Sequence, residues 1–319
     1  MSKTGPGKSH RQGMTLIDAM RKFSSEEAAE KWFSDERWPD SIECPRCGSR
    51  RIQEKTTHPT MPHRCRDCRK FFSVKTGSVM EGSNLTCQTW AIAIYLLATS
   101  LKSVSSMKLR RDLGITQKSA WHLAHRIRET FAEPEPPSYE GPVEVDETYM
   151  GGKRKNMPKS KREKMTGRGP VGKTAVVGIK DRDTNEVAAK VVQSTDAPTL
   201  TGFVESRSAD GASVYTDDAS AYLSLDRDRE TVNHSAGEYV RGEVHTNGVE
   251  SFWSMLKRAH KGTFHKMSPQ HLQKYVTEFA GKHNIRESET IDQMATIAAG
   301  MRDKKLRYRD LVGKQDLER

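Results

Sequence analysis

Apolar residues recur along this chain with two different spacings, and the change divides it into a helical first part and a mixed second part. Near the start, a polar helix-start signal precedes an apolar stripe at helical spacing, made of Ala28, Ala29, Trp32 and Phe33. Residues 15–33 are therefore predicted to form one or two short helices. Residues 80–128 have a helical pattern throughout, broken at Gly114.

Past residue 138, short runs rich in β-branched residues replace the helical pattern and predict strands. These runs cover residues 143–146, 174–180, 187–192 and 213–216, and a fifth begins at 232–233. Helices are predicted between and after them, at 198–206, 219–225, 248–259 and 269–282. Strands that are first antiparallel and then alternate with helices indicate an α/β domain with a mixed five-stranded sheet.

The proline-rich stretch at 134–138 is the clearest domain boundary, because it is stiff and unable to continue a helix. It separates a helical region before it from the α/β region after it. The expected order is a disordered tail (1–13), N-terminal helices (14–40), a cysteine-rich module (41–78), a helical region (79–133), the linker (134–138), an α/β domain (139–290) and a C-terminal helical tail (291–319).

Charge narrows the class of partner. The formal net charge is +11 and the pI about 9.4, with the excess gathered in residues 102–128 and 153–168, so a polyanion is the expected partner. The longest apolar run, residues 90–98, falls short of the roughly 20 residues that cross a bilayer. The N-terminus also lacks the apolar segment of a signal peptide. We expect no membrane association and a cytoplasmic, nucleoid-associated protein.

Four cysteines form two tight pairs, Cys44/Cys47 and Cys65/Cys68, with seventeen residues between the pairs. Two such knuckles facing each other complete a tetrahedral zinc site, and a four-thiolate site leaves no open position for catalysis. The alternative, two redox dithiols, lacks a surrounding thioredoxin-like pattern. We expect structural Zn²⁺ in a zinc ribbon, with Cys87 a buried apolar residue. The arginines between the ligands either contact DNA phosphates or form a solvated face.

The helical region contains a candidate helix-turn-helix. One helix runs to Leu113, Gly114 permits the turn, and Thr116 caps a second helix. The predicted buried stripe of that helix is Ala120, Leu123, Ala124 and Ile127. The residues on its other faces, predicted to reach the major groove of double-stranded DNA, are Gln117, Lys118, Trp121 and Arg128. An ordinary helical hairpin is the alternative.

Three carboxylates occupy positions that folding can bring together. Asp146 and Asp217 end β-branched runs as strand ends do, and Glu250 lies near the start of a predicted helix. Oxygen ligands of this kind hold paired Mg²⁺ or Mn²⁺ ions about 4 Å apart, an arrangement that cleaves phosphodiester bonds. In a basic chain with two DNA-binding signatures, this set suggests an enzyme that cuts or joins DNA.

Each acid also has a structural interpretation. Asn247 and Glu250 have the spacing of a helix capping box. The pair Asp217 and Asp218 precedes a predicted helix and is suited to cap it. Asp218 therefore remains a substitute for Asp217 as the metal ligand.

The sequence resembles a bacterial insertion-sequence transposase of the zinc-ribbon, DDE-type group related to eukaryotic Merlin elements. The matching stretches span roughly residues 14 to 310. The first is Cys-Pro-Arg-Cys-Gly, which starts at Cys44, together with Phe-Ser-Val-Lys-Thr-Gly-Ser, which ends at Ser78. The second is Val-Glu-Val-Asp-Glu-Thr-Tyr-Met-Gly-Gly-Lys, which ends at Lys153. The third is Val-Tyr-Thr-Asp, which ends at Asp217, and the fourth is His-Thr-Asn-Gly-Val-Glu-Ser-Phe-Trp, which starts at His245.

The resemblance implies an RNase H-like catalytic fold in which Asp146 and Asp217 are the first two catalytic carboxylates. The group has either Asn or Glu at the third position, with a downstream Lys. Asn247 is the family-style candidate, whereas Glu250 is the better metal ligand by charge and shares a helix face with Lys257. We favour Glu250 with Asn247 supporting it.

Lysines and arginines near these acids are expected to hold the cleaved DNA. On the predicted helix 248–259 and just beyond it, Lys257, Arg258 and Lys261 would bind phosphates. The alternative for Lys257 is a solvated lysine on an amphipathic helix. Lys153 lies near the start of a basic insert, residues 151–173. We interpret this insert as a mobile loop that becomes ordered on DNA.

The expected function is recognition of terminal inverted repeats, followed by strand cleavage and strand transfer. Because two transposon ends must be paired, a homodimer or larger assembly on DNA is expected. The alternative is a DNA-binding regulator that uses the zinc ribbon and helix-turn-helix on an inactive scaffold.

Overall fold

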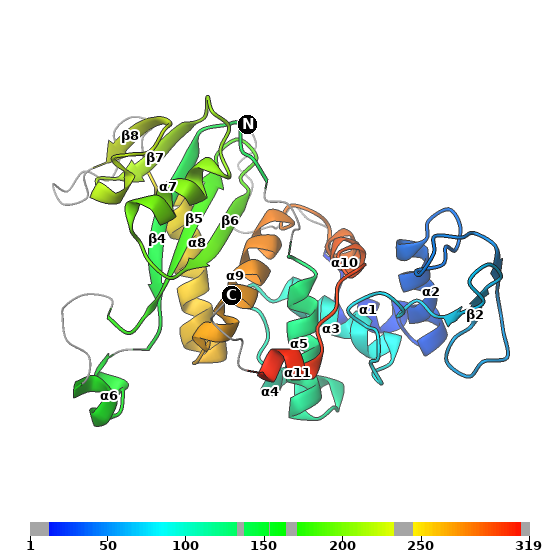
Figure 1. The fold of residues 1–319 in the computed structure, drawn as a ribbon. Helices are drawn as coiled ribbons and strands as arrows, with labels where there is room; N and C mark the ends of the chain where they lie inside the picture. Colours follow the sequence, from blue (N-terminus) through cyan, green and yellow to red (C-terminus); the bar gives the residue numbers. More distant parts are fainter. Residues whose placement is uncertain (1–12, 133–136, 153, 164–170, 233–244, 314–319) are drawn as a thin grey trace. The chain divides into compact units, whose positions relative to one another are not determined.

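The computed structural model describes residues 13–132, 137–152, 154–163, 171–232 and 245–313. The chain divides into two compact units (Figure 1). The helical unit contains Met1–Ala132 and Ile285–Arg319, and the sheet unit contains Glu133–Asn284. The helical unit is therefore built from both ends of the chain.

The helical unit packs its helices around one apolar core. Its helices are α1 (Leu16–Lys22), α2 (Glu26–Arg37), α3 (Cys87–Thr99), α4 (Ser106–Leu113), α5 (Gln117–Glu129), α10 (Thr290–Ala299) and α11 (Tyr308–Val312). The helical region predicted over 80–128, with one break at Gly114, differs in two respects: it begins at Cys87 and is also broken between Thr99 and Ser106. Ser103 in this second break has a left-handed backbone (φ 60°), which an α-helix does not accommodate.

Local capping explains where these helices begin and end. The Glu26 carboxylate accepts hydrogen bonds from the first backbone amides of α3, Cys87 N (2.8 Å) and Gln88 N (3.0 Å), satisfying donors that have no partner within the helix. Gly114 ends α4 in the left-handed conformation (φ 64°). Thr116 caps α5 through a bond from Ser119 N at 3.1 Å. The turn at Gly114 and the cap at Thr116 are thus confirmed.

The C-terminal residues belong to the helical unit. Met294, Ile297 and Met301 are buried in the same apolar cluster as Trp32 and Ile94. Lys304 Nζ donates to Thr130 O at 2.9 Å at the end of the same unit. The segment predicted as a separate helical tail therefore completes the core of the helical unit.

The sheet unit contains a five-stranded sheet with the order β6-β5-β4-β7-β8. The strands are β4 (Val143–Met150), β5 (Thr174–Asp181), β6 (Val187–Val192), β7 (Ser213–Asp217) and β8 (Asp228–Val232). The first three pair antiparallel, whereas β7 pairs in parallel with β4 and with β8. The prediction of an α/β domain with a mixed five-stranded sheet is confirmed, and β8 begins earlier than predicted.

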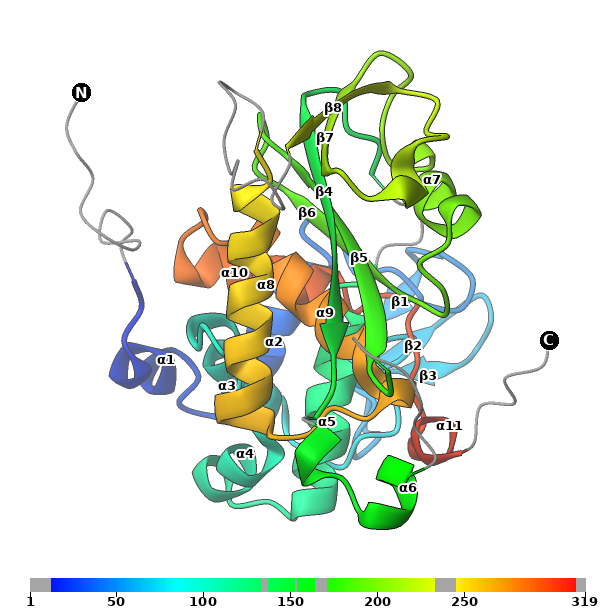
Figure 2. The ribbon, with the colours of Figure 1, turned by 90° about the vertical axis from the view of Figure 1, so that its left-hand side faces the viewer.

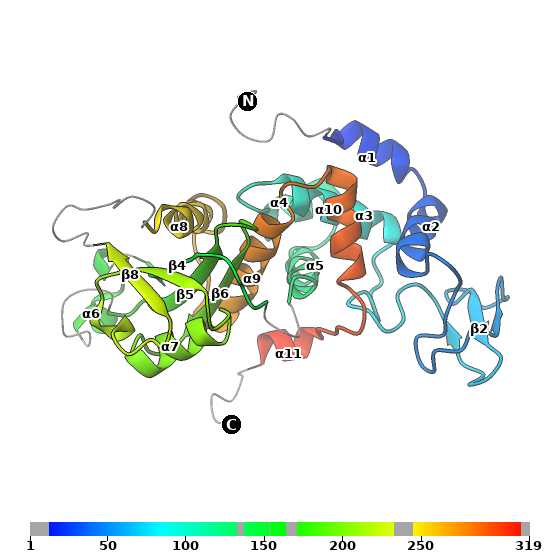
Figure 3. The ribbon, with the colours of Figure 1, turned by 90° about the horizontal axis from the view of Figure 1, so that it is seen from above.

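Helices cover both faces of this sheet (Figures 1 and 3). One face packs against α8 (Asn247–Ala259) and α9 (Pro269–Asn284) through a cluster that includes Trp253 and Tyr275. The other face packs against α7 (Ala197–Glu205) and the short helix η2 (Ser220–Tyr222). The predicted α-helix over 219–225 is therefore only a 3₁₀ turn. The insert before β5 includes η1 (Arg154–Asn156) and α6 (Lys159–Glu163), while Lys153 lies outside the described residues.

Among the helices of the described ranges, none combines the length and the apolar character that crossing a membrane requires.

Candidate active site, zinc site and helical surface

Strand register brings Asp146 and Asp217 together. In the parallel pair β4–β7, Val143 lies opposite Val214 and Glu144 opposite Tyr215. Continuing that register by two residues sets Asp146 beside Asp217. Side chains alternate across a strand, so Asp146 shares a face with Glu144, on the side covered by α8. Asp217 ends β7, whereas Asp146 lies in the middle of β4, which continues to Met150, so the prediction that Asp146 ends its strand is wrong. Both aspartates lie on the same side of the sheet.

Helix α8 brings Glu250 to the same place. Its apolar face, made of Val249, Phe252, Trp253, Leu256 and Ala259, is buried against the sheet. Figure 2 shows α8 alongside β4. Glu250 lies in the first turn of this helix and is exposed. Its charge contributes to the raised pKa of Asp146, so the two carboxylates are electrostatic neighbours.

The start of α8 is fixed to β4 by a buried carboxylate. Glu144, only 2% exposed, accepts a hydrogen bond from Val249 N at 3.0 Å. Its other oxygen pairs with Arg182 Nε at 2.9 Å, and His245 Nδ1 lies 3.4 Å away. Arg182 in turn stacks over the Tyr215 ring at 4.3 Å. The strand that bears Asp146 thus also holds the helix that bears Glu250.

Sequence reasoning missed this network because its members come from distant segments. The alternation in Val-Glu-Val-Asp contained a signal, since Glu144 and Asp146 must share a face. A glutamate inside a buried strand requires a partner, and no local pattern indicated which residue that partner is. The partners proved to be the amide end of α8 and two basic side chains.

A tight contact sets the separation between α8 and the sheet. Gly178 on β5 pairs with Asp146, and a Cβ added at Gly178 would lie 2.6 Å from Trp253 Cζ2. The indole is 2% exposed and has no room to retreat. A glycine is therefore required for α8 to approach at this distance.

Mutual repulsion marks the acidic cluster. Burial and the charges of Glu147, Asp217 and Glu250 raise the pKa of Asp146 to about 7. Burial also raises the pKa of Glu147, while a hydrogen bond from Tyr222 Oη at 2.8 Å opposes that change. Glu147 and Tyr222 were not predicted as part of this site. The oxygens of these carboxylates are ligands of the kind that Mg²⁺ prefers.

The oxygens of the acidic cluster are farther apart than the ligand atoms of a bound metal ion would be. Within the described ranges, the one group of at least three His, Cys, Asp or Glu residues whose ligand atoms all lie within 4.8 Å of one another is the cysteine quartet. Asp146, Asp217 and Glu250 share a region and influence one another's charge, but their oxygens are more widely spread than that.

The structural interpretations of these acids have separate outcomes. Thr246, not Asn247, is the residue before α8, and its side chain makes no capping hydrogen bond, so Asn247 and Glu250 do not form a capping box. Instead Thr246 Oγ1 donates to Glu250 Oε1 at 3.1 Å. Asp217 Oδ1 accepts from Ala219 N at 3.1 Å in a local turn, but no side chain caps the short helix η2 that follows. Asp218 is exposed.

The predicted phosphate-binding residues lie on the outer surface of α8 and just beyond it. Asn247, Lys257, Arg258 and Lys261 are all exposed. Lys257 follows Glu250 by seven residues, so the two side chains share one face of the helix. The structure thus sets an amide, a carboxylate and a lysine along one polar stripe opposite the buried face.

The four predicted zinc ligands converge in the helical unit. Cys44 Sγ lies 3.6 Å from Cys68 Sγ, and Cys47 Sγ lies 3.7 Å from Cys65 Sγ. A tetrahedron with Zn–S bonds of about 2.3 Å has sulfur separations of about 3.8 Å, so the four thiols are preformed for zinc. Three short strands support them: β1 (Ile52–Gln53), β2 (His63–Cys65) and β3 (Phe71–Phe72).

Backbone geometry also favours metal binding at this quartet. Each Cys-x-x-Cys pair is followed by a residue with a left-handed backbone, Gly48 (φ 70°) and Arg69 (φ 60°), which turns the chain back toward the metal. A hydrogen bond from Cys68 N to Cys65 Sγ, at 3.5 Å, lowers the pKa of Cys65 to about 6 and favours its thiolate. The arginines between the ligands, Arg46, Arg64, Arg66 and Arg69, are all exposed.

The surface of α5 differs from the sequence prediction. Gln117 and Lys118 are exposed, as a DNA-reading role requires. Trp121 is half-buried, and its ring packs 4.7 Å from His125 and 6.2 Å from Tyr308. Arg128 is 2% exposed, because it follows the buried Ala124 by one helical turn. The prediction that Arg128 reaches a groove is therefore incompatible with its burial.

Replacing Gly178 with Ala tests the contact that sets α8. The new methyl group would overlap the Trp253 ring, so we expect a loss of about 1–3 kcal/mol of unfolding free energy. Displacement of Glu250 should lower the rate of DNA cleavage on the order of tenfold. The matched control is Gly202→Ala in α7, where a Cβ meets nothing within 4 Å and stability should rise slightly. Equal cleavage rates in both variants would contradict the assignment.

Comparison with known proteins gives the class of the molecule. Residues 139–284 match the model of an ISXO2-like transposase domain. Residues 24–71 match the model of a transposase zinc-ribbon domain. An uncharacterized protein in the transposable element ISH50 of Halobacterium salinarum is 28% identical over 296 residues, covering 87% of this chain and 97% of that protein.

The five-stranded α/β sheet and the cysteine quartet coincide with the two matched regions. Together these regions cover more than half of the chain, and both are parts of transposases. The chain thus carries both domains of a zinc-ribbon, DDE-type transposase, and the similar protein belongs to a transposable element. The match to the DDE domain implies an RNase H-like fold for the sheet unit.

Proposed function

We propose that this protein is an active transposase that binds the terminal inverted repeats of its insertion sequence and catalyses strand cleavage and strand transfer. The observation that supports this best is the register of β4 and β7, which sets Asp146 beside Asp217. The helix that bears Glu250 is held to the same strand through Glu144. A scaffold without catalysis has no need for acids that repel one another on neighbouring strands and the adjoining helix.

In this proposal Asp146, Asp217 and Glu250 hold two Mg²⁺ or Mn²⁺ ions. Asn247, one turn before Glu250, supports the third ligand. We assign Asp217 rather than Asp218 because Asp217 continues the register with Asp146. Bound metal would supply activation of the attacking water or 3′-hydroxyl and stabilisation of the leaving oxygen.

The basic side chains have a separate task. Lys257, Arg258 and Lys261 are exposed on and beyond the helix that bears Glu250, where they would hold phosphates of the cleaved strand. In the helical unit, Gln117 and Lys118 would read the terminal repeat from a helix-turn-helix formed by α4 and α5. The zinc ribbon would contribute a second contact through its exposed arginines.

Cleavage and transfer require two transposon ends in one complex. We therefore propose a homodimer or larger assembly on DNA, formed on the chromosome inside the cell. Lys153 remains a proposed DNA contact on the basic insert.

The experiment is a donor-end cleavage assay on duplex DNA taken from the sequence immediately flanking the reading frame. With Mg²⁺ or Mn²⁺, labelled ends should be nicked to release 3′-hydroxyls, and these should join to target DNA. Specific binding to the flanking repeat without cleavage in either metal would support the alternative, a DNA-binding regulator. Cleavage that shows no preference for the flanking repeat would indicate a nuclease that acts on a different DNA substrate.

A further inference from the structure

A basic segment near the C-terminus packs on α5, the helix that we propose reads DNA. The segment comprises residues 302–312 and contains five Lys and Arg residues against two Asp. The family models match residues 24–71 and 139–284, so this segment lies outside both. Figure 3 shows its helix α11 close to α5 within the helical unit.

Two buried hydrogen bonds anchor the segment. The carbonyl oxygen of Leu306 lies 3.0 Å from His122 Nε2 and accepts from Arg126 Nε at 3.1 Å. Arg126 is 8% exposed and also donates to Glu81 O at 2.9 Å. A charged side chain buried in this way is held firmly, because each lost bond would leave a donor unsatisfied.

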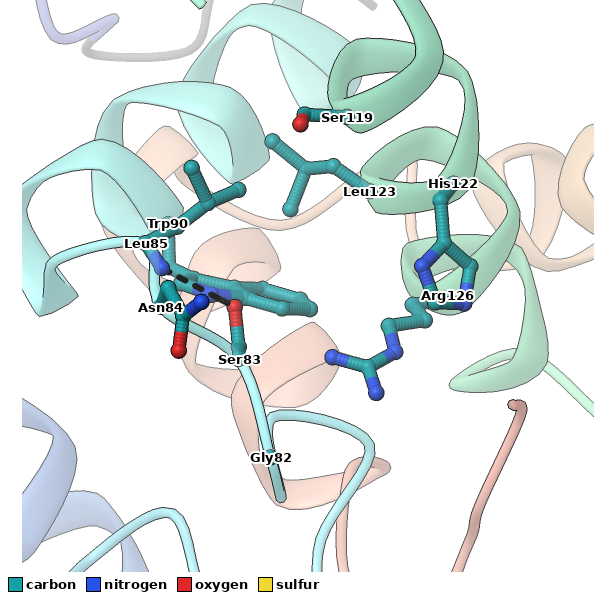
Figure 4. A pocket seen from close by; sticks show the side chains of 9 residues that line it. All are labelled: Gly82, Ser83, Asn84, Leu85, Trp90, Ser119, His122, Leu123 and Arg126. Carbon is teal, nitrogen blue, oxygen red and sulfur yellow. Dashed lines mark hydrogen bonds between the residues drawn. The ribbon is translucent and has the colours of Figure 1, made fainter. Parts of the chain in front are cut away.

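The same residues connect the segment to the rest of the helical unit. His122 and Arg126 line a cavity of about 170 Å³ together with Ser83, Asn84 and Trp90 (Figure 4). Ser83 in turn accepts a bond from Trp90 Nε1 at 3.2 Å. The segment is therefore anchored to residues that line the same cavity as Ser83 and Trp90 of the helical unit.

An aromatic contact aligns the segment with the proposed reading face. The Lys118 ammonium lies 4.3 Å from the centre of the Tyr308 ring, within the range of a cation–π contact. The rings of Trp121 and His122 meet the same tyrosine at 6.2 and 5.5 Å. Tyr308 thus lies beside Lys118, the predicted base contact of α5 that is both basic and exposed.

The charges that flank Tyr308 face solvent. Arg307 and Arg309 are exposed, and Arg309 pairs only at 3.5 Å with the exposed Asp310 beside it. Arg307 is the residue before α11 and Arg309 is the second residue of this five-residue helix. Their exposed charges add to that of Lys118, which favours a polyanion.

We propose that the segment 302–312 is a second half of the double-stranded DNA surface of the helical unit, with Arg307 and Arg309 contacting phosphates next to the site read from α5. This inference rests on the proposed DNA-binding role of α5. The buried anchors fix the register between the two halves, and Tyr308 holds Lys118 in place.

The test measures binding of the full chain to a fluorescent duplex from the flanking DNA, at several salt concentrations. Arg307→Ala with Arg309→Ala should weaken binding about tenfold at about 0.1 M salt. The slope of log K against log salt should become shallower by about 2, because each phosphate contact contributes about 0.9. Arg307→Lys with Arg309→Lys, which keeps both charges, should retain most of the slope. Tyr308→Ala should weaken binding severalfold with little change of slope.

The outcomes separate this inference from the function on which it rests. The inference is overturned if the double alanine variant keeps its affinity and slope while Gln117→Ala with Lys118→Ala loses binding. Tighter binding by the double alanine variant would also overturn it, since the segment would then be a cover over α5. Unchanged melting curves for these exposed substitutions verify that the variants are folded.

Discussion

Replacing Asp146 with Asn is expected to reduce donor-end cleavage and strand transfer by about 10³-fold or more while binding of the transposon end persists. Asp146 lies between Asp217 on the neighbouring strand and Glu250 on α8, whose charges both raise its pKa. An amide keeps the shape of the side chain but removes the charge that ligates a divalent cation. Loss of about 4 kcal/mol of transition-state stabilisation corresponds to this factor.

The same substitution, Asp146→Asn, should raise the stability of the metal-free protein although it lowers activity. Burial and neighbouring carboxylates raise the pKa of Asp146 from 3.8 to about 7. The folded protein therefore binds this proton more tightly than the unfolded chain does. The resulting stability is fully present below about pH 4 and is lost as the pH rises toward about 7. At pH 8, Asp146→Asn should melt at a higher temperature than the wild type without metal.

Added Mg²⁺ should then distinguish the two proteins. In the wild type, cation binding offsets the repulsion, and saturating metal should raise the unfolding free energy by about 1–3 kcal/mol. In Asp146→Asn this rise should be largely absent. The matched control is Asp218→Asn, an exposed carboxylate next to the site, which should keep both activity and the Mg²⁺ response. If Asp218→Asn is inactive and Asp146→Asn is active, the assignment of the acids is wrong.

The second large effect is expected at the zinc site. Cys65→Ser should reduce bound zinc from one ion per chain to none under dilute conditions, because three thiolates and a hydroxyl form a far weaker site. The ribbon has little else to hold it together: its strands have only two or three residues, and its apolar cluster centres on Phe72 and the cysteines themselves. We expect residues 41–72 to become sensitive to proteolysis.

Cys87→Ala is the matched control for this substitution. Cys87 is buried at the start of α3 and lies outside the quartet, so the variant should retain zinc while losing a little core packing. The sheet unit should melt as before in Cys65→Ser. Retention of stoichiometric zinc by Cys65→Ser, measured by mass spectrometry of the native protein, would contradict the four-thiolate assignment.

Features set by local spacing could be predicted from the sequence. The two Cys-x-x-Cys pairs, the turn at Gly114 and the strands that carry Asp146 and Asp217 depend on a few adjacent residues, although β4 continues past Asp146 to Met150. Their positions were therefore visible without a structure. Burial of Ala120, Leu123 and Ile127 followed from helical periodicity in the same way.

Features that depend on distant segments could not be predicted. Arg128 is a different case: it was assigned to the surface because arginine is usually exposed, although its position one turn after the buried Ala124 was a local signal of burial. The partners of Glu144 come from β5 and α8 and are fixed only when the sheet closes. Likewise, nothing local in residues 285–313 indicated that they return to the helical unit.

That return determines how the protein can be shortened. Because the chain leaves the helical unit at Ala132 and re-enters it at Ile285, the sheet unit is an insertion within it. A fragment that stops at the proline-rich linker would lack Met294, Ile297 and Met301, and would leave their neighbours Trp32 and Ile94 facing water. A prematurely terminated product would therefore expose part of the apolar core of the helical unit to water.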